Sequence, residues 1–444
     1  MVEAAGIEST ERHQSFARAF AGVGAMAILT YMGEYAAFII VLVYLSDKFT
    51  VQFQMGTVGY ALVGTISGVF LIASGLAAIY MGHLCDLYGR RRMMIIGCLV
   101  GAVSLSSLIV ANSFSQLVPF AVATAASMVT LAMAHGTYTA ATLAYGGDLA
   151  EVHQTMGKAY GLVDGAEFAG YAFGPALGST VAFLLRSRTD VFEMSTSLLL
   201  VSAVLAVFFM PEVRHLVQPR GEAHHDEPEP ASAHSHAHVH DHSASWRDYL
   251  AAFKLPIVGV ALLTTFVGAV GFSAFFTFVP LYAHFLQGIV PPFSFLYGYF
   301  ASIMAVSGIL FMVPFGHFVD RRQRRMPYLV AGLVAAAASL LLVAGLQATV
   351  ESFILASVTF GLSIGAVRVG QLVILAESSH PSNRAAVMGT NHAMEHVGYG
   401  VAAILAGTLV AYVGGFVSAF RFLSLILLLA GLAFLLYSRK ARVK

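Results

Sequence analysis

The segment GHLCDLYGRRR, Gly82 to Arg92, decides the fold of this chain, because it is a short polar gap between two long apolar runs. A near copy, GHFVDRRQRR (Gly316 to Arg325), lies about half a chain length further on, in a similar gap. Each copy has a glycine, an aspartate four residues later and a cluster of arginines. The repetition predicts a chain built from two similar halves.

Composition independently indicates a membrane protein. Hydrophobic residues make up 58% of the chain and charged residues only 11%, whereas a soluble domain carries about 25% charged residues. A transmembrane helix needs about 20 mostly apolar residues. Twelve stretches meet this need, the first of which is expected to be a retained helix because no clear signal-peptide cleavage site accompanies it. They are residues 18–45, 56–81, 93–112, 116–145, 157–185, 192–210, 255–285, 294–317, 327–347, 351–376, 385–413 and 416–438.

The two polar gaps resemble the signature loop of the major facilitator superfamily (MFS), which joins helices two and three and again helices eight and nine. The resemblance implies an all-α integral membrane protein with twelve transmembrane helices in two six-helix pseudo-symmetric bundles. It also implies a secondary transporter rather than an enzyme. The motif positions of this loop are expected to form a gate on the cytoplasmic side. These residues are Gly82, Asp86, Gly89, Arg90, Arg91, Gly316, Asp320 and Arg321. Because Gln323 stands where the first copy has Gly89, the gate role is favoured for Asp86. The alternative is charge that only sets topology.

The placement of charge predicts the orientation. We place both termini and every even-numbered loop in the cytoplasm. Most Lys and Arg residues then lie on the cytoplasmic side. The exceptions are Arg368, within a span, and the four residues on the external side, Lys48, Arg186, Arg188 and Arg421. This asymmetry fits the positive-inside rule. We therefore expect both termini in the cytoplasm. The compact chain with short loops indicates a bacterial inner membrane, and we expect a monomer. The net charge of +1 argues against a nucleic-acid partner.

A polar segment divides the chain into residues 1–210, a linker at 211–253, and residues 254–444. The linker carries prolines, acidic residues and a run of histidines. Neutral imidazoles of this kind bind Zn²⁺, Ni²⁺, Co²⁺ or Cu²⁺, and the alternative is a solvated spacer. No permanent cofactor is expected. The possible metal ligands are His224, His225, His234, His236, His238, His240 and His242.

A second internal repeat pairs GLVDGAEFAGY (Gly161 to Tyr171) with GTNHAMEHVGY (Gly389 to Tyr399). The first copy runs into GYAFGPALGS, which resembles a glycine-proline motif of the drug:proton antiporter branch of the superfamily. Small residues of this kind also serve ordinary close helix packing. The fourth span departs from that branch, because Ala132 stands at the position of its usual arginine. The residues that carry the motif are Gly170, Gly174, Pro175 and Gly178.

Ionisable residues inside spans are costly and therefore mark candidate functional sites. Each could instead be structural, Arg368 for example as the partner of a carboxylate across the cavity. The pattern H-x-x-E-H in the eleventh span matches a zinc-peptidase motif, but a peptidase is rejected inside an apolar helix. Two roles are left open for His392, Glu395 and His396: proton coupling, or binding of a divalent metal ion during transport. The substrate- and proton-site candidates are Glu34, His135, Asp164, Glu167, Arg368, His392, Glu395 and His396.

The leading hypothesis is a proton-coupled exporter of a small organic compound that works by alternating access. The alternative is an exporter of divalent metal ions or metal chelates, with the histidine run as a metal-binding element. A third possibility is a receptor or scaffold with a transporter fold. Aromatic residues of the seventh span are expected to close the site on one side, and these are Phe272, Phe275, Phe276 and Phe278.

Overall fold

The computed structural model describes residues 2–153, 156–210, 256–286, 296–322, 326–345, 349–378 and 384–442, and all regular structure within these ranges is helical. Lipid supplies no hydrogen-bond partners, so a helix, which satisfies its own backbone, is the natural element for such apolar runs. The long helices are α1 (Val2–Asp47), α2 (Gly59–Tyr88), α3 (Arg90–Ala111), α4 (Leu117–His153), α5 (Met156–Leu185), α6 (Thr189–Phe209), α8 (Pro256–Leu286), α9 (Tyr297–Arg322), α10 (Met326–Gly345), α11 (Val350–Ser378), α12 (Arg384–Leu409) and α13 (Gly415–Arg442).

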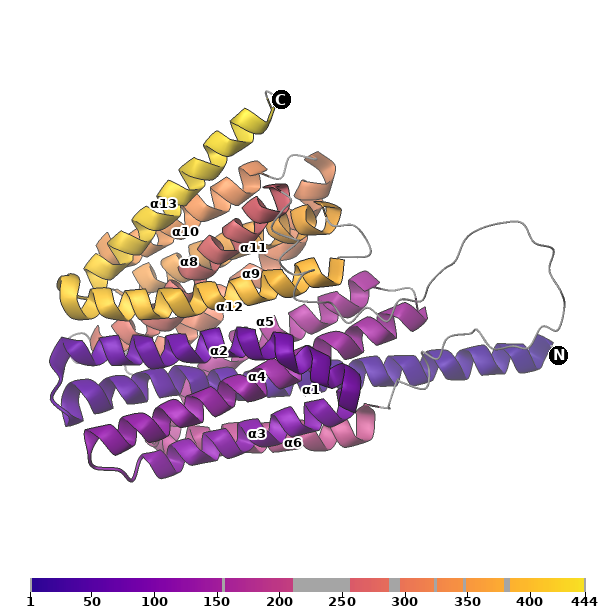
Figure 1. Ribbon diagram of the computed structural model, residues 1–444, viewed down its shortest axis with the longest axis horizontal. Helices are drawn as coiled ribbons and strands as arrows, with labels where there is room; N and C mark the ends of the chain where they lie inside the picture. The colour runs from indigo at the N-terminus through magenta and orange to yellow at the C-terminus, as the bar shows by residue number, and fades with distance from the viewer. Residues whose placement is uncertain are drawn as a thin grey trace.

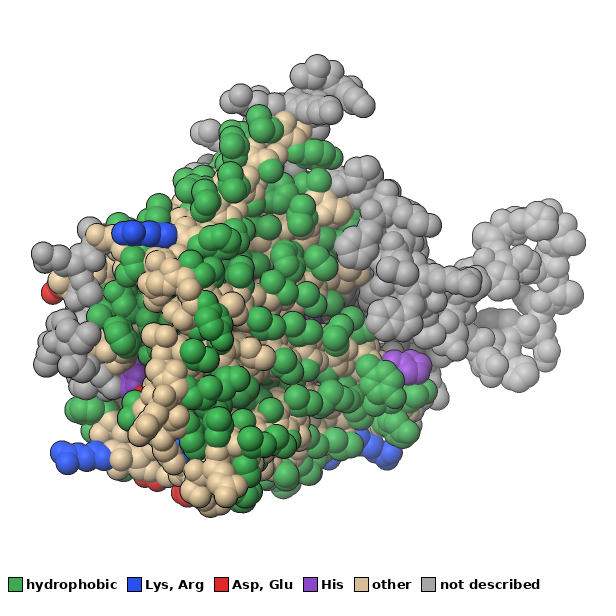
Figure 2. All heavy atoms as spheres, turned by 60° about the vertical axis from the view of Figure 1, so that its left-hand side comes forward, with side chains coloured by type: hydrophobic (Ala, Val, Ile, Leu, Met, Phe, Trp, Pro, Cys, Tyr) green, Lys and Arg blue, Asp and Glu red, His purple; other side chains and the backbone are tan. Residues whose placement is uncertain are grey.

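The expected number of membrane helices is confirmed. Ten described stretches are long and apolar enough to cross a membrane; the longest, Thr390–Tyr437, contains two helices, and Tyr297–Met312 adds a shorter apolar helix. Large apolar side chains point outward, for example Phe208 at 76% exposure and Leu184 at 68%. Hydrophobic side chains cover most of the described surface in Figure 2, with Lys and Arg near its margins. Such a surface needs lipid around it.

The helices form two bundles of the same design. In one bundle α1 packs on α5 and α6, α2 packs on α4, and α3 packs on α4 and α6. In the other, α8 packs on α12 and α13, α9 packs on α11, and α10 packs on α11 and α13. The bundles meet through α2 with α12, α5 with α9, and α1 with α8. Figure 1 shows α2 lying along α12 where the two bundles join.

Two glycines of the internal repeat show how closely the bundles copy each other. A Cβ on Gly170 of α5 would lie 2.3 Å from Cβ of Tyr31 in α1. A Cβ on Gly398 of α12 would lie 2.7 Å from the carbonyl oxygen of Phe266 in α8. Equivalent glycines therefore let equivalent helix pairs pack at backbone contact, and the predicted repeat is a repeat of packing.

The turn between α2 and α3 explains Gly89 in the signature loop. It is one residue long, and Gly89 has φ +93° and ψ 141°, a conformation that is essentially restricted to glycine. The other short elements are η1 (Lys48–Gln52) and η2 (Gly56–Val58), which join α1 to α2, and η4 (Val410–Gly414), which joins α12 to α13.

The first helix is longer than its apolar run. The apolar run was predicted to start at residue 18, whereas α1 begins at Val2 and its first part extends beyond the bundle in Figure 1. Residues 2–17 are rich in Ala and Glu, which favour helix without any burial. The linker 211–253 and all its histidines lie outside the described residues.

Candidate functional site

A small cavity lies between the two bundles. Its volume is about 20 Å³, measured as the space open to the centre of a water molecule, which is room for about one water. Six helices contribute to its wall. The lining residues are Glu34, Tyr35, Phe38, Phe70, Leu71, Ser74, His135, Tyr171, Phe272, Ser273, Phe276, Thr277, His396 and Tyr399.

Glu34 of α1 is the carboxylate of this cavity. It is 1% exposed, and His135 of α4, 2% exposed, places Nδ1 2.9 Å from both of its carboxylate oxygens. Tyr138, one turn along α4, donates its hydroxyl to Oε2 of Glu34. A carboxylate removed from water requires such partners. Nε2 of His135 is buried and has no hydrogen-bond partner among the described residues.

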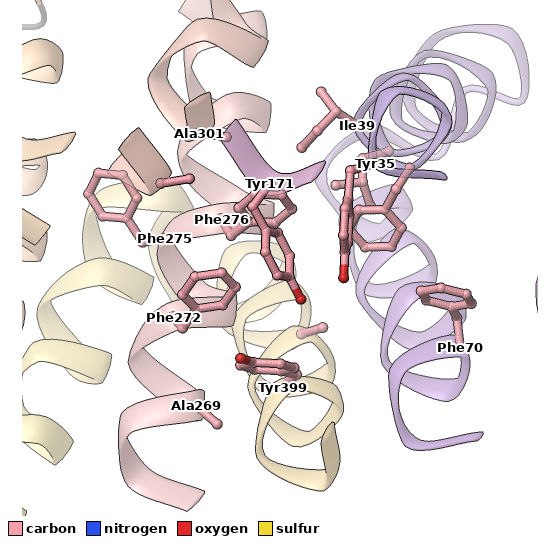
Figure 3. Packing of buried hydrophobic residues seen from close by; sticks show 14 of the residues in the cluster. Tyr35, Ile39, Phe70, Tyr171, Ala269, Phe272, Phe275, Phe276, Ala301 and Tyr399 are labelled. Carbon is pink, nitrogen blue, oxygen red and sulfur yellow. The ribbon is translucent and has the colours of Figure 1, made fainter. Parts of the chain in front are cut away.

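Aromatic rings build the rest of the wall. Tyr35 and Tyr171 stack with ring centroids 3.9 Å apart, and Phe272 stacks on Phe276 at 5.4 Å. Figure 3 shows Tyr35 and Tyr171 facing each other from different helices, with Phe272, Phe276 and Tyr399 beside them, while Phe275 points away from this group. Of the four phenylalanines expected to close the site, Phe272 and Phe276 therefore line the cavity, and Phe275 and Phe278 are buried without lining it.

Glu395 of α12 pairs within its own bundle. Arg368 of α11 donates from Nη1 to Oε1 of Glu395 at 2.5 Å, and the Tyr399 hydroxyl donates to the same oxygen at 2.5 Å. The Arg368 guanidinium also lies 4.8 Å from the ring centroid of Phe168 in the other bundle, a cation–π distance. Arg368 therefore pairs with a carboxylate on the next helix of its own bundle, and not with one across the cavity as the structural alternative expected. Arg368 and Glu395 are 18% and 13% exposed.

The equivalent carboxylate, Glu167 of α5, repeats part of this arrangement. It is buried and accepts a hydrogen bond from the Tyr171 hydroxyl at 3.3 Å. Tyr171 and Tyr399 are equivalent in the internal repeat, so both bundles have a carboxylate held by the tyrosine one turn later. The side chain of Asp164, also predicted here, lies outside the described residues.

The histidines of the H-x-x-E-H pattern lie close together. The rings of His392 and His396 have centroids 4.5 Å apart, while Glu395 is bound to Arg368. Nδ1 of His396 lies 2.9 Å from Oγ of Ser74 in α2. Among the described residues no group of three or more His, Cys, Asp or Glu is arranged to hold a metal ion.

The signature loop is described only in part. Arg90 donates to the carbonyl oxygen of Cys85 at 3.4 Å, and Arg91 donates to that of Val207, near the end of α6, at 2.5 Å. A cation there is favourable, because the C-terminal end of a helix carries partial negative charge. Gly82 lies in α2 with open space around it. The side chains of Asp86, Asp320 and Arg321 and the surroundings of Gly316 lie outside what the structure describes.

With this geometry in place, comparison with known proteins settles the family. A family model described as Major Facilitator Superfamily matches residues 23–341 and 294–444. The chain belongs to the major facilitator superfamily. This MFS chain is 25% identical over 271 residues to "Multidrug resistance protein 2" of Bacillus subtilis (strain 168), an alignment that covers 60% of each protein. It therefore spans less than two thirds of that relative's length.

Solved structures share the MFS fold. A bacterial homologue of the human lysosomal transporter Spinster matches with a TM-score of 0.71 and 14% identity, covering 96% of this chain and 97% of that one. The POT family transporter PepTSo matches at 0.69 and 14%, covering 96% and 99%. The human organic anion transporter MFSD10 matches at 0.61 and 16%, covering 94% and 99%. The fold class is thereby confirmed. Membership of the superfamily agrees with the prediction of a membrane transporter rather than an enzyme.

The helix-five motif of this MFS chain packs two helices together. Cβ atoms on Gly174 and Gly178 would lie 2.8 and 2.5 Å from carbonyl oxygens of α1. Beside Pro175, the amide of Ala176 donates to Ser302 Oγ of α9 at 3.0 Å and so links the bundles. The close-packing interpretation accounts for these contacts.

Two sets of site residues were missed from the sequence. Tyr138 lies three residues after His135 on one helix face, a spacing that could have revealed it. Asp47, at the end of α1, has Oδ1 2.8 Å from Nε2 of His284 in α8 and is also bound by Arg188, which immediately precedes α6. No local pattern joins these three residues, because they come from distant parts of the chain.

Proposed function

We propose that this MFS transporter is proton-coupled and exports small organic compounds by alternating access. The observation that supports this most is Glu34, a carboxylate buried at the wall of an aromatic cavity between the two bundles. In transporters built from repeats the substrate and coupling-ion sites lie at the interface between the repeats. The name of the Bacillus relative, a multidrug resistance protein, agrees with an organic substrate.

The geometry suggests how Glu34 alternates between ligands. When it is protonated, its charge is absent and the cavity can remain small and closed. When a substrate enters, it must displace the contacts of Phe272 and Phe276 and widen the cavity, because the present volume admits only about one water. A cationic or hydrogen-bonding group then replaces the proton on Glu34, and aromatic rings offer contact area to many apolar shapes.

We further propose that the Gly89 loop and both termini face the cytoplasm of a bacterial inner membrane, and that the chain works as a monomer. The contact of Asp47 with His284, which joins the bundles at the opposite end, would then close the external side. The charge asymmetry of the loops supports this orientation.

Export of divalent metal ions or metal chelates is the second candidate. It rests on the histidine run between 224 and 242, which lies outside the described residues. A loosely bound Zn²⁺, Ni²⁺, Co²⁺ or Cu²⁺ in that run is compatible with either substrate class. We rank the organic compound first because the cavity wall is aromatic and Glu395 is already bound by Arg368.

The test is substrate-driven proton movement in liposomes that contain a pH-sensitive dye. The panel is tetraphenylphosphonium, ethidium, chloramphenicol, Zn²⁺, Mn²⁺, Co²⁺ and Ni²⁺. We expect proton flux with at least one organic compound, lost in Glu34→Gln and kept in Glu193→Gln, which alters an exposed glutamate of α6. Flux with metals alone would transfer the proposal to metal export. Transport without proton flux in the wild type, or full coupling in Glu34→Gln, would refute proton coupling through this site.

A further inference from the structure

A histidine of the other bundle also lines the cavity. His396 of α12 is 2% exposed and lines the same space as Glu34 and His135. Its ring centroid lies 5.3 Å from that of His135, with 50° between the ring planes. The two imidazoles are therefore neighbours across the boundary between the two bundles, although 261 positions separate them.

Hydrogen bonds determine which nitrogen of each ring is available. Ser74 donates its hydroxyl to the carbonyl oxygen of Leu71 at 2.8 Å, so its oxygen accepts from Nδ1–H of His396 at 2.9 Å. In the same way Nδ1–H of His135 donates to the Glu34 carboxylate. A neutral imidazole has one donor and one acceptor nitrogen, so Nε2 is the acceptor in both rings.

Nε2 of His135 lacks a partner. It is buried and makes no hydrogen bond to any described residue, and an unsatisfied buried polar atom costs about 1–3 kcal/mol. A proton on Nε2 of His396 would give it a donor through the single water that fits in the cavity. Proton transfer through one water is within the reach of a general acid and base.

We propose that His135 and His396 form a proton-transfer pair that carries the coupling proton across the boundary between the bundles to Glu34. This inference rests on the proposed proton coupling. His396 with both nitrogens protonated gives its Nε2 proton to Nε2 of His135, and the Nδ1 proton of His135 moves to the Glu34 carboxylate. The products are a neutral His396, a neutral His135 in its other tautomer and a protonated Glu34, so one proton has moved and none is lost.

The packing around His396 makes this transfer depend on how the bundles are arranged. A Cβ on Gly75 of α2 would lie 2.4 Å from Cβ of His396, and one on Gly68 would lie 2.6 Å from the carbonyl oxygen of Gly400. The two helices thus meet at backbone contact beside the histidine. A rocking motion that separates α2 from α12 would separate the rings and interrupt the transfer.

Other charged and titratable groups surround the pair. On its own helix His396 has His392 at 4.5 Å and Tyr399 at 5.4 Å between ring centroids, with Glu395 paired to Arg368 of α11. Around His135 the titratable groups are Glu34 and Tyr31 of α1, Tyr138 of α4, and Glu167 of α5. The residues of α2 and α8 that line the cavity are aromatic, aliphatic or hydroxyl residues, none of them charged. His392 does not line the cavity, so it provides a matched control.

The test follows the protonation of Glu34 by time-resolved infrared spectroscopy after a pH jump, on the full chain in lipid nanodiscs and without substrate. The carboxyl band of Glu34 is assigned by its loss in Glu34→Gln. The key variant is His396→Asn, because Asn keeps a donor near the position of Nδ1 for Ser74 and has no atom at Nε2. The control is His392→Asn, and a thermal melt checks that both variants fold.

We expect His396→Asn to slow the protonation of Glu34 by about a hundredfold, the usual scale of a positioned acid or base, and His392→Asn to leave the rate unchanged. An unchanged rate in His396→Asn, or equal slowing in both variants, would overturn the relay. If His396→Asn does not fold, His135→Asn is measured instead against the same expectation. Liposome flux separates the two proposals: slowed protonation of Glu34 in a protein whose transport moves no protons would support proton transfer through the histidines and overturn its role in coupling.

Discussion

Asp47 offers the sharpest test of how the two bundles are held closed. It is the last residue of α1, immediately before η1, and a carboxylate that is partly removed from water needs partners. The Asp47 carboxylate is stabilised by two partners, Arg188 in the same bundle and His284 in the other. When the bundles separate at this end, the contact with Arg188 is kept and the contact with His284 is lost. Asp47→Asn should therefore favour the open arrangement.

The size of the effect follows from the exposure of the pair. A hydrogen bond to a charged group contributes about 1.5–3 kcal/mol when buried. His284 is 8% exposed but Asp47 is 36% exposed, so solvent screening reduces the contribution to about 1 kcal/mol. This free energy corresponds to about a fivefold change in the ratio of open to closed protein.

Distances between spin labels measure that ratio directly. Val51 in η1 and Tyr412 in η4 are exposed, lie in different bundles and flank this end of the molecule. They can be replaced by cysteine for labelling, because the two native cysteines are buried. Pulsed electron–electron resonance on Val51→Cys/Tyr412→Cys should show the long-distance population increase about fivefold, relative to the short one, when Asp47→Asn is added.

The matched controls separate the two contacts of Asp47. His284→Gln removes the contact between bundles and should reproduce the increase. Arg188→Gln removes only the contact within one bundle and should change the ratio less than twofold, the scale of a weak exposed pair. An equal increase in Arg188→Gln, or no increase in both Asp47→Asn and His284→Gln, would show that this contact does not hold the bundles together.

Three further substitutions test the packing and the second ion pair. Gly170→Ala should cost about 3 kcal/mol or more and lower the melting temperature, because its Cβ would meet the neighbouring helix at 2.3 Å, whereas Gly165→Ala has open space and should be tolerated. Arg368→Gln should lower the free energy of unfolding by about 3 kcal/mol, because Glu395 loses its cation. Adding Glu395→Gln should restore most of the melting temperature, and no recovery would contradict the pairing. Gly89→Ala should cost about 1–3 kcal/mol at φ +93°, and an unchanged melting temperature would show that the turn rearranges.

The fold could be predicted because its signals are local or repeated. Each apolar run is long enough to be a span by itself, and the two copies of the glycine, aspartate and arginine pattern fix the correspondence of the halves. The repeat of Gly161–Tyr171 at Gly389–Tyr399 was also informative, since Gly170 and Gly398 make equivalent contacts. These inferences required no knowledge of which helices touch.

The partners of the buried charges could be predicted only in part. His392, Glu395 and His396 share a helix face in the sequence, but the structure gives them different surroundings: Glu395 binds Arg368, His396 binds Ser74, and His392 packs on His396. A helix face spans a wide arc, and where α12 meets both α2 and α8 each position on that arc faces a different neighbour. Spacing establishes that residues are near each other and not what they bind.

The two bundles share a frame but differ in chemistry, and this difference makes an asymmetric site possible. Gly170 meets Tyr31 and Gly398 meets Phe266, so three residues further along α1 and α8 the equivalent positions are Glu34 and Ala269. The carboxylate of the cavity thus has no counterpart in the other bundle. Conversely, Glu395 is neutralised by Arg368 inside its own bundle. A change of charge on Glu34 therefore alters the cavity wall from one side only, which is what a site needs if binding a proton is to change how one bundle rests against the other.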